Sequence, residues 1–270
     1  MQIQELPSMP RRREPLQIQR AVLFALVVRD LRARVEGRWL GLLWMLFEPL
    51  AHMLVIIGVL GARSNLFLVN VDYPVFLITG LLPFFLFRNL AIKLPSSIGA
   101  NRSLFAYRQV LPIDALAARA IVEVSLYSAV YIVALALLGW MGHHATPHAP
   151  IELIAVSFVL LSLGAGLGLL FSVVTHQRPK VTAVIGLIFY PLYFVSGVIF
   201  PLHNLAPNIR SWLLLNPVLH LVELSRLYFI PNYTAVPGIS LAYPAAWALV
   251  VAALSMSLYR VYRFRFLTFG

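Results

Sequence analysis

The stretch from Ile151 to Thr175 reads IELIAVSFVLLSLGAGLGLLFSVVT and contains one ionisable residue, Glu152, near its beginning. About 20 mostly apolar residues are what an α-helix needs to cross a lipid bilayer. Backbone polar groups in lipid must be bonded within the segment, so the stretch predicts a transmembrane helix. Five further stretches have this character. The six predicted spans are 39–62, 73–94, 114–141, 151–175, 181–200 and 243–262.

The composition agrees with an all-α integral membrane protein. Of the 270 residues, 60% are hydrophobic and 11% are charged, whereas a soluble domain needs more polar residues at its surface. The net charge of +11 is also typical of nucleic-acid binders, but here the cations lie between apolar runs rather than on one face. The chain has no cysteine, which excludes disulfides and thiolate metal sites. We predict a cytoplasmic tail over 1–20 and a single transmembrane domain over 21–270.

The lysines and arginines predict the orientation, because cytoplasmic loops carry an excess of these residues. All but three of the 21 lie before the first span, around the second or fourth connection, or after the last span. The three on the other side are Arg63, Arg210 and Arg226. Both termini are therefore predicted to be cytoplasmic.

A seventh apolar stretch, Ser211–Phe229, contains Glu223 and Arg226. Each of these costs about 2.5–3.5 kcal/mol at the centre of a span. We therefore predict that Leu202–Ala242 forms short re-entrant helices on the periplasmic side between spans five and six. Within it, His220, Glu223 and Arg226 recur at steps of three and predict a charge-and-cap network at a periplasmic gate. A metal site needs more ligands than these, so we predict no metal.

The segment Ala21–Arg38 mixes apolar residues and arginines at helical spacing, which predicts a basic amphipathic interface helix. It serves either as an anchor to anionic lipid or as a docking surface for a cytoplasmic partner. Ionisable residues inside spans usually face the protein interior. The predicted structural charges within the membrane are Glu48, His52, Arg88 and Glu123. We expect Glu48 and Arg88 to form an ion pair.

Aromatic residues gather on the first and fifth predicted spans. They either pack in the core or interfacial belt, or line a pore, because flat rings with polar tips suit sugars. The candidate channel residues are Trp44, Phe47, Phe189, Tyr190, Tyr193 and Phe194. A phosphate-binding loop needs a lysine after glycine, and neither Lys93 nor Lys180 follows one. We predict no catalytic residue and no cofactor in this chain.

From about Phe24 to Tyr262, the chain resembles the membrane subunits of type-2 ABC exporters, and within them the KpsM-like capsular polysaccharide permeases with their BexB and CtrC relatives. The stretches that carry the resemblance are Leu40-Gly41-Leu42-Leu43-Trp44, Glu48-Pro49-x-x-His52, Tyr73-Pro74-Val75-Phe76-Leu77, Gly80-Leu81-x-Pro83-Phe84-Phe85, Leu104-Phe105-x-Tyr107-Arg108, Pro112-Ile113-Asp114, Pro191-Leu192-Tyr193-Phe194, Phe200-Pro201-Leu202-His203, Asn216-Pro217 and Glu223-Leu224-Ser225-Arg226.

The resemblance implies a homodimer in the inner membrane of a Gram-negative bacterium, in which the first and fifth helices line the channel. It implies a KpsT-type nucleotide-binding subunit that binds ATP and Mg, a periplasmic polysaccharide copolymerase and an outer-membrane export channel. It also implies that Ala21–Arg38 and a short coupling helix, roughly Pro95–Leu104, contact the ATPase. The implied contact residues are Arg29, Asp30, Arg32, Arg34, Ser96, Ser97, Asn101 and Arg102.

The implied substrate is a lipid-anchored acidic capsular polysaccharide. Four cations would attract it at a cytoplasmic entry, or they only satisfy the topology rule. They are Arg88, Lys93, Arg102 and Arg108. The alternatives are export of O-antigen or teichoic acid, efflux of small molecules or lipids, a membrane-embedded enzyme, and an ion-coupled carrier. The scattered acids disfavour the enzyme, and the lack of an internal repeat disfavours the carrier.

Overall fold

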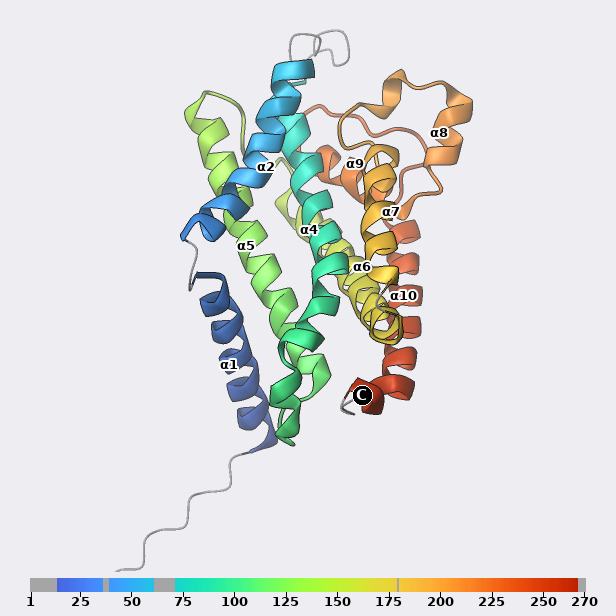
Figure 1. Cartoon of the computed structure of the whole chain (residues 1–270). Coiled ribbons are helices and arrows are strands. Elements are labelled where there is room, and N and C mark those ends of the chain that lie inside the picture. Colours follow the sequence, from blue (N-terminus) through green and yellow to red (C-terminus); the bar gives the residue numbers. More distant parts are fainter. Residues whose placement is uncertain (1–13, 36–38, 61–70, 179, 267–270) are drawn as a thin grey trace, which may run out of the picture.

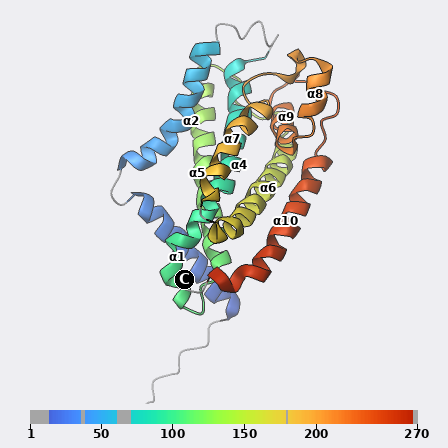
Figure 2. The same ribbon diagram turned by 45° about the vertical axis from the view of Figure 1, so that its right-hand side comes forward.

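The computed structural model describes residues 14–35, 39–60, 71–178 and 180–266, and this part of the chain is helical without a β-strand. The long helices form one bundle (Figures 1 and 2). They are α1 (Pro15–Val35), α2 (Trp39–Leu60), α4 (Tyr73–Ala100), α5 (Pro112–Trp140), α6 (Pro150–Gln177), α7 (Val181–Val195) and α10 (Ala242–Tyr262). The short elements are η2 (Arg102–Ala106), η3 (Leu202–Asn204), α8 (Pro207–Leu213), α9 (Pro217–Phe229) and η4 (Arg263–Phe266). The predicted all-α class is confirmed.

Four of the described helices, α4, α5, α6 and α10, are long and apolar enough to cross a membrane. Helices α2 and α7 supply the shorter apolar stretches Phe47–Val59 and Val181–Val195. The predicted end of the fifth span at Phe200 is wrong, because α7 stops at Val195 and Gly197 has a φ of 65°. Glycine adopts this left-handed conformation without a steric penalty and commonly ends helices.

Helix α4 lies at the centre of the bundle and packs against α2, α5, α6, α7 and α9. Residues Val75–Leu82 are all buried, as expected of a helix that is surrounded by protein. Its closest neighbour is α6, where Gly164 and Gly168 face it. A Cβ atom at Gly168 would lie 2.7 Å from the carbonyl oxygen of Leu90. This Gly-x-x-x-Gly spacing is what lets two membrane helices approach closely.

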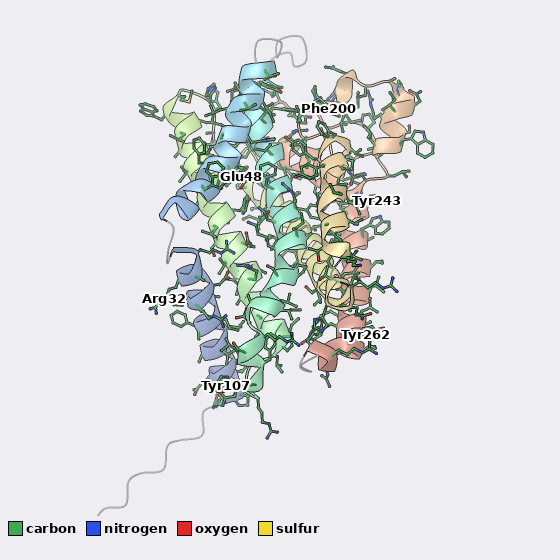
Figure 3. All side chains as sticks on the ribbon, in the orientation of Figure 1. Arg32, Glu48, Tyr107, Phe200, Tyr243 and Tyr262 are labelled. Atoms are coloured by element: carbon green, nitrogen blue, oxygen red, sulfur yellow. The ribbon has the colours of Figure 1, made fainter. Side chains whose placement is uncertain are left out.

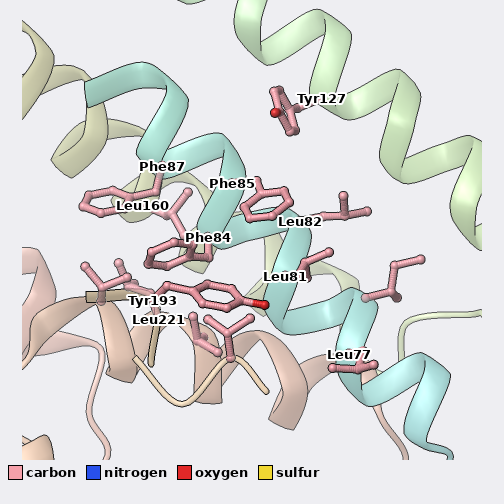
Figure 4. Close-up of a cluster of buried hydrophobic side chains, with 14 of the residues drawn as sticks. Leu77, Leu81, Leu82, Phe84, Phe85, Phe87, Tyr127, Leu160, Tyr193 and Leu221 are labelled. Carbon is pink, nitrogen blue, oxygen red and sulfur yellow. The ribbon is translucent and has the colours of Figure 1, made fainter. Parts of the chain in front are cut away.

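Aromatic side chains of α4 and α7 join in the main apolar core (Figure 4). The ring centroid of Tyr193 lies 5.3 Å from that of Phe84 and 6.2 Å from that of Phe85. Phe87 and Phe189 form a further pair at 5.9 Å. Offset or tilted aromatic pairs at these separations add to the stabilisation from burial. The core therefore fixes α7 against α4 at its aromatic face.

Helix α1 begins at Pro15, before the predicted Ala21, and packs along α5 (Figure 1). Leu26 is the buried residue of α1, with 5% of its surface exposed. Phe24, on the predicted apolar face, is 71% exposed. Helix α5 has 29 residues, so at about 1.5 Å per residue it is longer than the hydrocarbon layer of about 30 Å. The additional turns at the N-terminal end of α5 provide a surface on which α1 packs.

The predicted coupling helix over Pro95–Leu104 is not a separate element. Helix α4 continues through Pro95 to Ala100, and the short helix η2 follows from Arg102. The backbone N–H of Asn101 donates to carbonyls of the last turn of α4 and ends it. Short helices do occupy the segment between α7 and α10, as predicted, and they lie at the end of the bundle opposite α1 and η4 (Figure 2).

Candidate functional site

Three helices enclose a cavity of about 400 Å³, which we call the aromatic pocket. Helices α2, α4 and α7 contribute its walls, and it contains five of the six candidate channel residues. Its lining residues are Trp44, Phe47, Glu48, Ala51, His52, Val55, Phe84, Phe85, Arg88, Phe189, Tyr190 and Tyr193. The aromatic residues of the first and fifth predicted spans thus lie around one cavity, and their role as channel residues stays a prediction.

The aromatic pocket has a buried wall and an exposed rim. Phe189 and Tyr193, four residues apart on α7, are 3% and 9% exposed, whereas Trp44, Phe47 and Tyr190 are more than half exposed. Residues four apart on a helix share a face, which explains why Phe189 and Tyr193 both point inward. The sixth candidate, Phe194, does not line the pocket and packs edge-on against Tyr193 at 5.4 Å.

One hydrogen bond joins the two helices that carry these rings. Nε2 of His52 on α2 lies 2.9 Å from the hydroxyl oxygen of Tyr193 on α7. The His52 ring also packs against Phe85 of α4 at 5.4 Å. His52 thus connects α2 to both α4 and α7. The hydrogen bond also satisfies the imidazole of His52 and the hydroxyl of Tyr193 inside the bundle.

Glu48 and Arg88 both line the aromatic pocket but do not form the predicted ion pair. In residues 14–35, 39–60, 71–178 and 180–266, neither lies within 4.0 Å of an opposite charge. The guanidinium carbon of Arg88 instead lies 5.4 Å from the ring centroid of Tyr190. A cation over an aromatic face keeps its charge available to a second anionic partner. Figure 3 shows Glu48 on α2 well above Arg32.

Glu123, the fourth predicted intramembrane charge, belongs to another site. It is fully buried and accepts from Arg34 Nη2 at 2.6 Å and from Lys93 Nζ at 3.5 Å. Two cations around one buried carboxylate compensate for its removal from water. The residues that meet here come from α1, α4 and α5, so the contact joins the first helix to the bundle.

Further polar contacts continue this connection along α1. Asp30 accepts from Arg119 Nη1 of α5 at 2.6 Å and also pairs with Arg34. The amide of Gln19 donates to Asp114, and Arg29 donates to the carbonyl of Ala100 at 2.5 Å. We call the contacts of Gln19, Arg29, Asp30 and Arg34 with α4 and α5 the polar ladder.

The polar ladder changes the interpretation of the predicted ATPase contacts. Asp30 and Arg34 are engaged within the chain, and Ser97 is buried, so these three do not present a surface to a partner. Arg32 and Ser96 are exposed, and Asn101 is partly buried at the end of α4. Only part of the predicted ATPase contact residues is therefore accessible to a partner, and this part lies on α1 and around the end of α4.

The predicted periplasmic gate residues are buried. Arg226 is fully buried; its Nη1 donates to the carbonyl of Gly197 at 2.9 Å, and its Nη2 donates to that of Val198 at 2.7 Å. Its Nη1 also lies 3.1 Å from Glu223 Oε1. The guanidinium stacks 3.6 Å from the ring centroid of Phe76. This buried cluster, which we call the Arg226 node, connects α4, the end of α7 and α9.

Two neighbours complete the Arg226 node. The hydroxyl of Tyr233 donates to Glu223 Oε2 at 2.8 Å, and burial raises the pKa of Tyr233, with the Glu223 carboxylate acting in the same direction. Gly80 is required by the close approach, because a Cβ atom there would lie 2.5 Å from Arg226 Nη2. The node is thus a packed structural contact rather than an open gate in this conformation.

His220 bonds separately from the other two gate residues. The backbone N–H of Ser240 donates to its Nδ1 at 3.1 Å, so Nε2 carries the proton and donates to the carbonyl of Leu214 at 2.8 Å. Asn216 caps α9 by accepting from the N–H of Val218. These bonds hold the loops on both sides of α9.

The four predicted entry cations do not form one site. Arg88 lines the aromatic pocket, Lys93 contacts Glu123, Arg102 borders a different cleft, and Arg108 lies exposed after η2. The described part of the chain also has no group of three or more His, Asp or Glu side chains that could hold a metal ion.

Comparison with known proteins places this arrangement in a family. Residues 21–230 match the model of the ABC-2 type transporter family. The chain belongs to this family. It is 39% identical over 249 residues to the polysialic acid transport protein KpsM of Escherichia coli, which covers 92% of this chain and 96% of that protein. Membership implies a partner ATPase, and the apolar helices make this ABC-2 chain a multi-pass membrane protein.

Two further relatives are named as inner-membrane proteins of capsule polysaccharide export. CtrC of Neisseria meningitidis serogroup B is 26% identical over 246 residues, 91% of each chain. BexB of Haemophilus influenzae is 27% identical over 215 residues, 79% of this chain and 81% of that protein. These relatives are named for transport rather than for an enzymatic reaction.

Several contacts of this ABC-2 chain were not anticipated from the sequence. Arg34 with Glu123 and Asn89 with Tyr127 connect residues far apart in sequence, where spacing gives no information on the partner. The Gly164-x-x-x-Gly168 pattern was a readable signal for close packing of α6. Chemically, the aromatic pocket offers flat rings, hydroxyl tips, one guanidinium, one carboxylate and one imidazole.

Proposed function

We propose that this chain is the permease subunit of an ATP-driven exporter that moves lipid-anchored acidic capsular polysaccharide across the bacterial inner membrane. The observation that carries the proposal is the 39% identity, over 92% of the chain, to a protein named for polysialic acid transport. The aromatic pocket supports it, because rings on α2 and α7 provide a surface for sugars.

In this proposal the chain crosses the membrane six times, with α2 and α7 completing the set formed by α4, α5, α6 and α10. Helix α7 is short for a span, and its outer end would be surrounded by protein from η3, α8 and α9, which permits irregular backbone at that depth. Both termini lie in the cytoplasm. The positions of α1 and η4 at the same end of the bundle support an even number of crossings (Figure 1).

The absence of cysteine makes the topology directly testable. Ser211→Cys on α8 should react with a membrane-impermeant maleimide added to spheroplasts, and Tyr107→Cys after η2 should react only after permeabilisation. Both side chains are exposed. The reverse labelling pattern would refute the orientation.

Two copies would form the channel. Helices α2 and α7 each present large apolar side chains outside the aromatic pocket, among them Val59 at 69% and Ile188 at 56% exposed. In the homodimer these faces lie opposite each other and enclose the path of the polymer. Val59→Cys or Ile188→Cys should give disulfide-linked dimers on oxidation, since Cα atoms within about 7 Å can be bridged. Ile154→Cys on α6, which is 69% exposed, is the matched control and should stay monomeric.

The energy for transport would come from a separate nucleotide-binding subunit that holds ATP and Mg. It would contact the exposed side of α1 and the region around η2, so that movement on ATP binding reaches α5 through the polar ladder. A periplasmic copolymerase and an outer-membrane channel would then receive the polymer.

Arg88 would be the residue of the aromatic pocket that favours acidic polymers. It projects into a cavity walled by low-dielectric aromatic groups, where a charge acts more strongly than in water. Among the described residues no carboxylate lies within 4.0 Å of its guanidinium, and Glu48, which lines the same pocket, is not paired with it. An acidic sugar that passes the rings would therefore meet an attractive charge midway.

Deletion of the gene in the source bacterium tests the proposal. Capsule should disappear from the cell surface and polymer should accumulate inside, and a plasmid copy should restore export. Surface capsule that is unchanged by the deletion would refute the proposal. Increased drug sensitivity with unaltered capsule would instead assign the chain to small-molecule efflux.

A further inference from the structure

A second cleft, of about 980 Å³, lies at the end of the bundle that carries α1 and η4, away from the aromatic pocket. It is bordered by the last turns of α4 and α6, the first turn of α7, and η4. Arg102, Arg178, Arg265 and His176 contribute to its lining, and the described lining residues include no carboxylate. We call it the arginine cleft. Three guanidinium groups around one cavity create a positive field that favours an anion.

The arginine cleft is held in shape by packing and not only by surface side chains. Phe266 of η4 is 2% exposed and packs in an apolar cluster with Leu169 and Val173 of α6. Its ring centroid lies 4.7 Å from that of His176. Nε2 of His176 bonds the carbonyl of Arg265 at 3.2 Å. Helix α6 therefore fixes η4 in place as one wall of the cleft.

One of the arginines has its hydrogen-bonding groups available. Within the part of the chain that the structure describes, the guanidinium of Arg178 has no carboxylate or hydrogen-bond acceptor as a partner. Arg178 directly follows the last residue of α6 and lines the cleft together with Thr182 from the first turn of α7. The unpaired N–H groups of a helix's first turn also favour an anion. Guanidinium groups bind phosphate with paired hydrogen bonds.

The depth of the arginine cleft suits an amphiphile. Its outer lining lies at the turn between α6 and α7, and its inner lining reaches Ser172 and Ile92, which lie one to three helical turns from the ends of α6 and α4. At about 1.5 Å per residue this is a depth of roughly 8–12 Å. The headgroup layer of a bilayer covers about 5–8 Å on each side of the hydrocarbon core. The cleft is thus about as deep as the headgroup layer, so that one lipid can place its phosphate at the arginines and its glycerol at the inner lining.

We propose that the arginine cleft binds the phosphate group of an anionic phospholipid from the surrounding leaflet. The phosphate lies between Arg102 and Arg178, and the glycerol lies against the apolar inner wall. Because η2, the end of α4 and the turn between α6 and α7 all border the cleft, the bound lipid holds these segments together. The inference does not depend on which substrate the aromatic pocket carries.

The probe for the test is dihexanoylphosphatidylglycerol, a soluble short-chain lipid, titrated calorimetrically into the full-length chain in detergent. Dihexanoylphosphatidylcholine is the matched control: it carries the same phosphate, but its trimethylammonium group cancels the negative charge and is repelled by the arginines, so it should bind at least about tenfold more weakly. Arg102→Gln combined with Arg178→Gln should weaken binding of the anionic probe by about tenfold or more. Arg178→Lys keeps the charge and should retain most of the affinity. Arg108→Gln, an exposed arginine outside the cleft, should leave it unchanged.

Equal affinity for the two lipids, or unchanged affinity in the double variant with a normal unfolding temperature, would overturn the proposal. Inorganic phosphate that displaces the lipid at equal concentration would assign the cleft to free phosphate. Displacement of the lipid by the purified ATPase subunit would assign it to protein docking. Either displacement would also refute the lipid assignment.

Discussion

Replacement of Arg226 by methionine is the most direct test of the buried contacts that hold the outer segment. The change keeps an unbranched apolar side chain and removes the guanidinium with its charge. It leaves the carboxylate of Glu223, which is fully buried, with the hydroxyl of Tyr233 as its only described partner. It also leaves the carbonyls of Gly197 and Val198 without their donors.

The magnitude follows from these losses. Removal of one partner from a buried ion pair destabilises a protein by about 3–5 kcal/mol, because the other charge remains uncompensated. We therefore expect Arg226→Met to lower the free energy of unfolding by at least about 3 kcal/mol. Adding Glu223→Leu removes the stranded carboxylate but not the unpaired carbonyls. The double variant should recover part of the loss, with a coupling of about 1–3 kcal/mol between the two positions.

The free energy of unfolding can be measured by titrating the folded chain in mild detergent with sodium dodecyl sulfate and recording tryptophan fluorescence. Arg108→Met, an exposed arginine, is the control and should change the free energy by no more than about 0.5 kcal/mol. A loss below about 1 kcal/mol for Arg226→Met would show that the node does not stabilise the fold. Strictly additive losses in the double variant would show that the two side chains do not act as a pair.

Three further predictions concern other parts of the bundle. Gly168→Leu should lower the free energy of unfolding by about 1–3 kcal/mol or more in the same titration, because a Cβ atom would already lie 2.7 Å from the Leu90 carbonyl; an unchanged value would contradict the close packing of α4 and α6. Arg88→Gln should reduce surface capsule in the complementation assay while Arg88→Lys retains it, and equal export by both would exclude a role for the charge. Asp30→Arg should reduce ATP-dependent export and the added change Arg119→Asp should restore it, unless their 2.6 Å contact is incidental.

The sequence predicted the helices well because length and hydropathy are local properties. The runs that form α4, α5, α6 and α10 are long enough to span a bilayer whatever they pack against. Helix ends were less predictable: α7 stops at Val195 because Gly197 adopts a left-handed conformation, although apolar residues continue to Phe200. Hydropathy alone does not detect such a turn.

The site was predicted in part for the same reason. Residues on one helix face, such as Phe189 and Tyr193, are related by spacing, and the structure places both in the aromatic pocket. Partners on different helices are not related by spacing, so the expected pair of Glu48 with Arg88 was wrong, and Arg34 was not expected to reach Glu123. Which charges meet depends on how the helices are arranged, and this is set by the packing of the whole bundle.

The shortness of α7 has a consequence for the wall that it forms in the proposed channel. With 15 residues it measures about 22 Å, against a hydrocarbon thickness of about 30 Å. Beyond Val195 the wall continues in irregular backbone that is bonded by protein, because the carbonyls of Gly197 and Val198 accept from the buried Arg226. In the channel proposed above, the apolar helical part of this wall is therefore about a quarter shorter than the hydrocarbon layer, and the packed outer segment forms the rest.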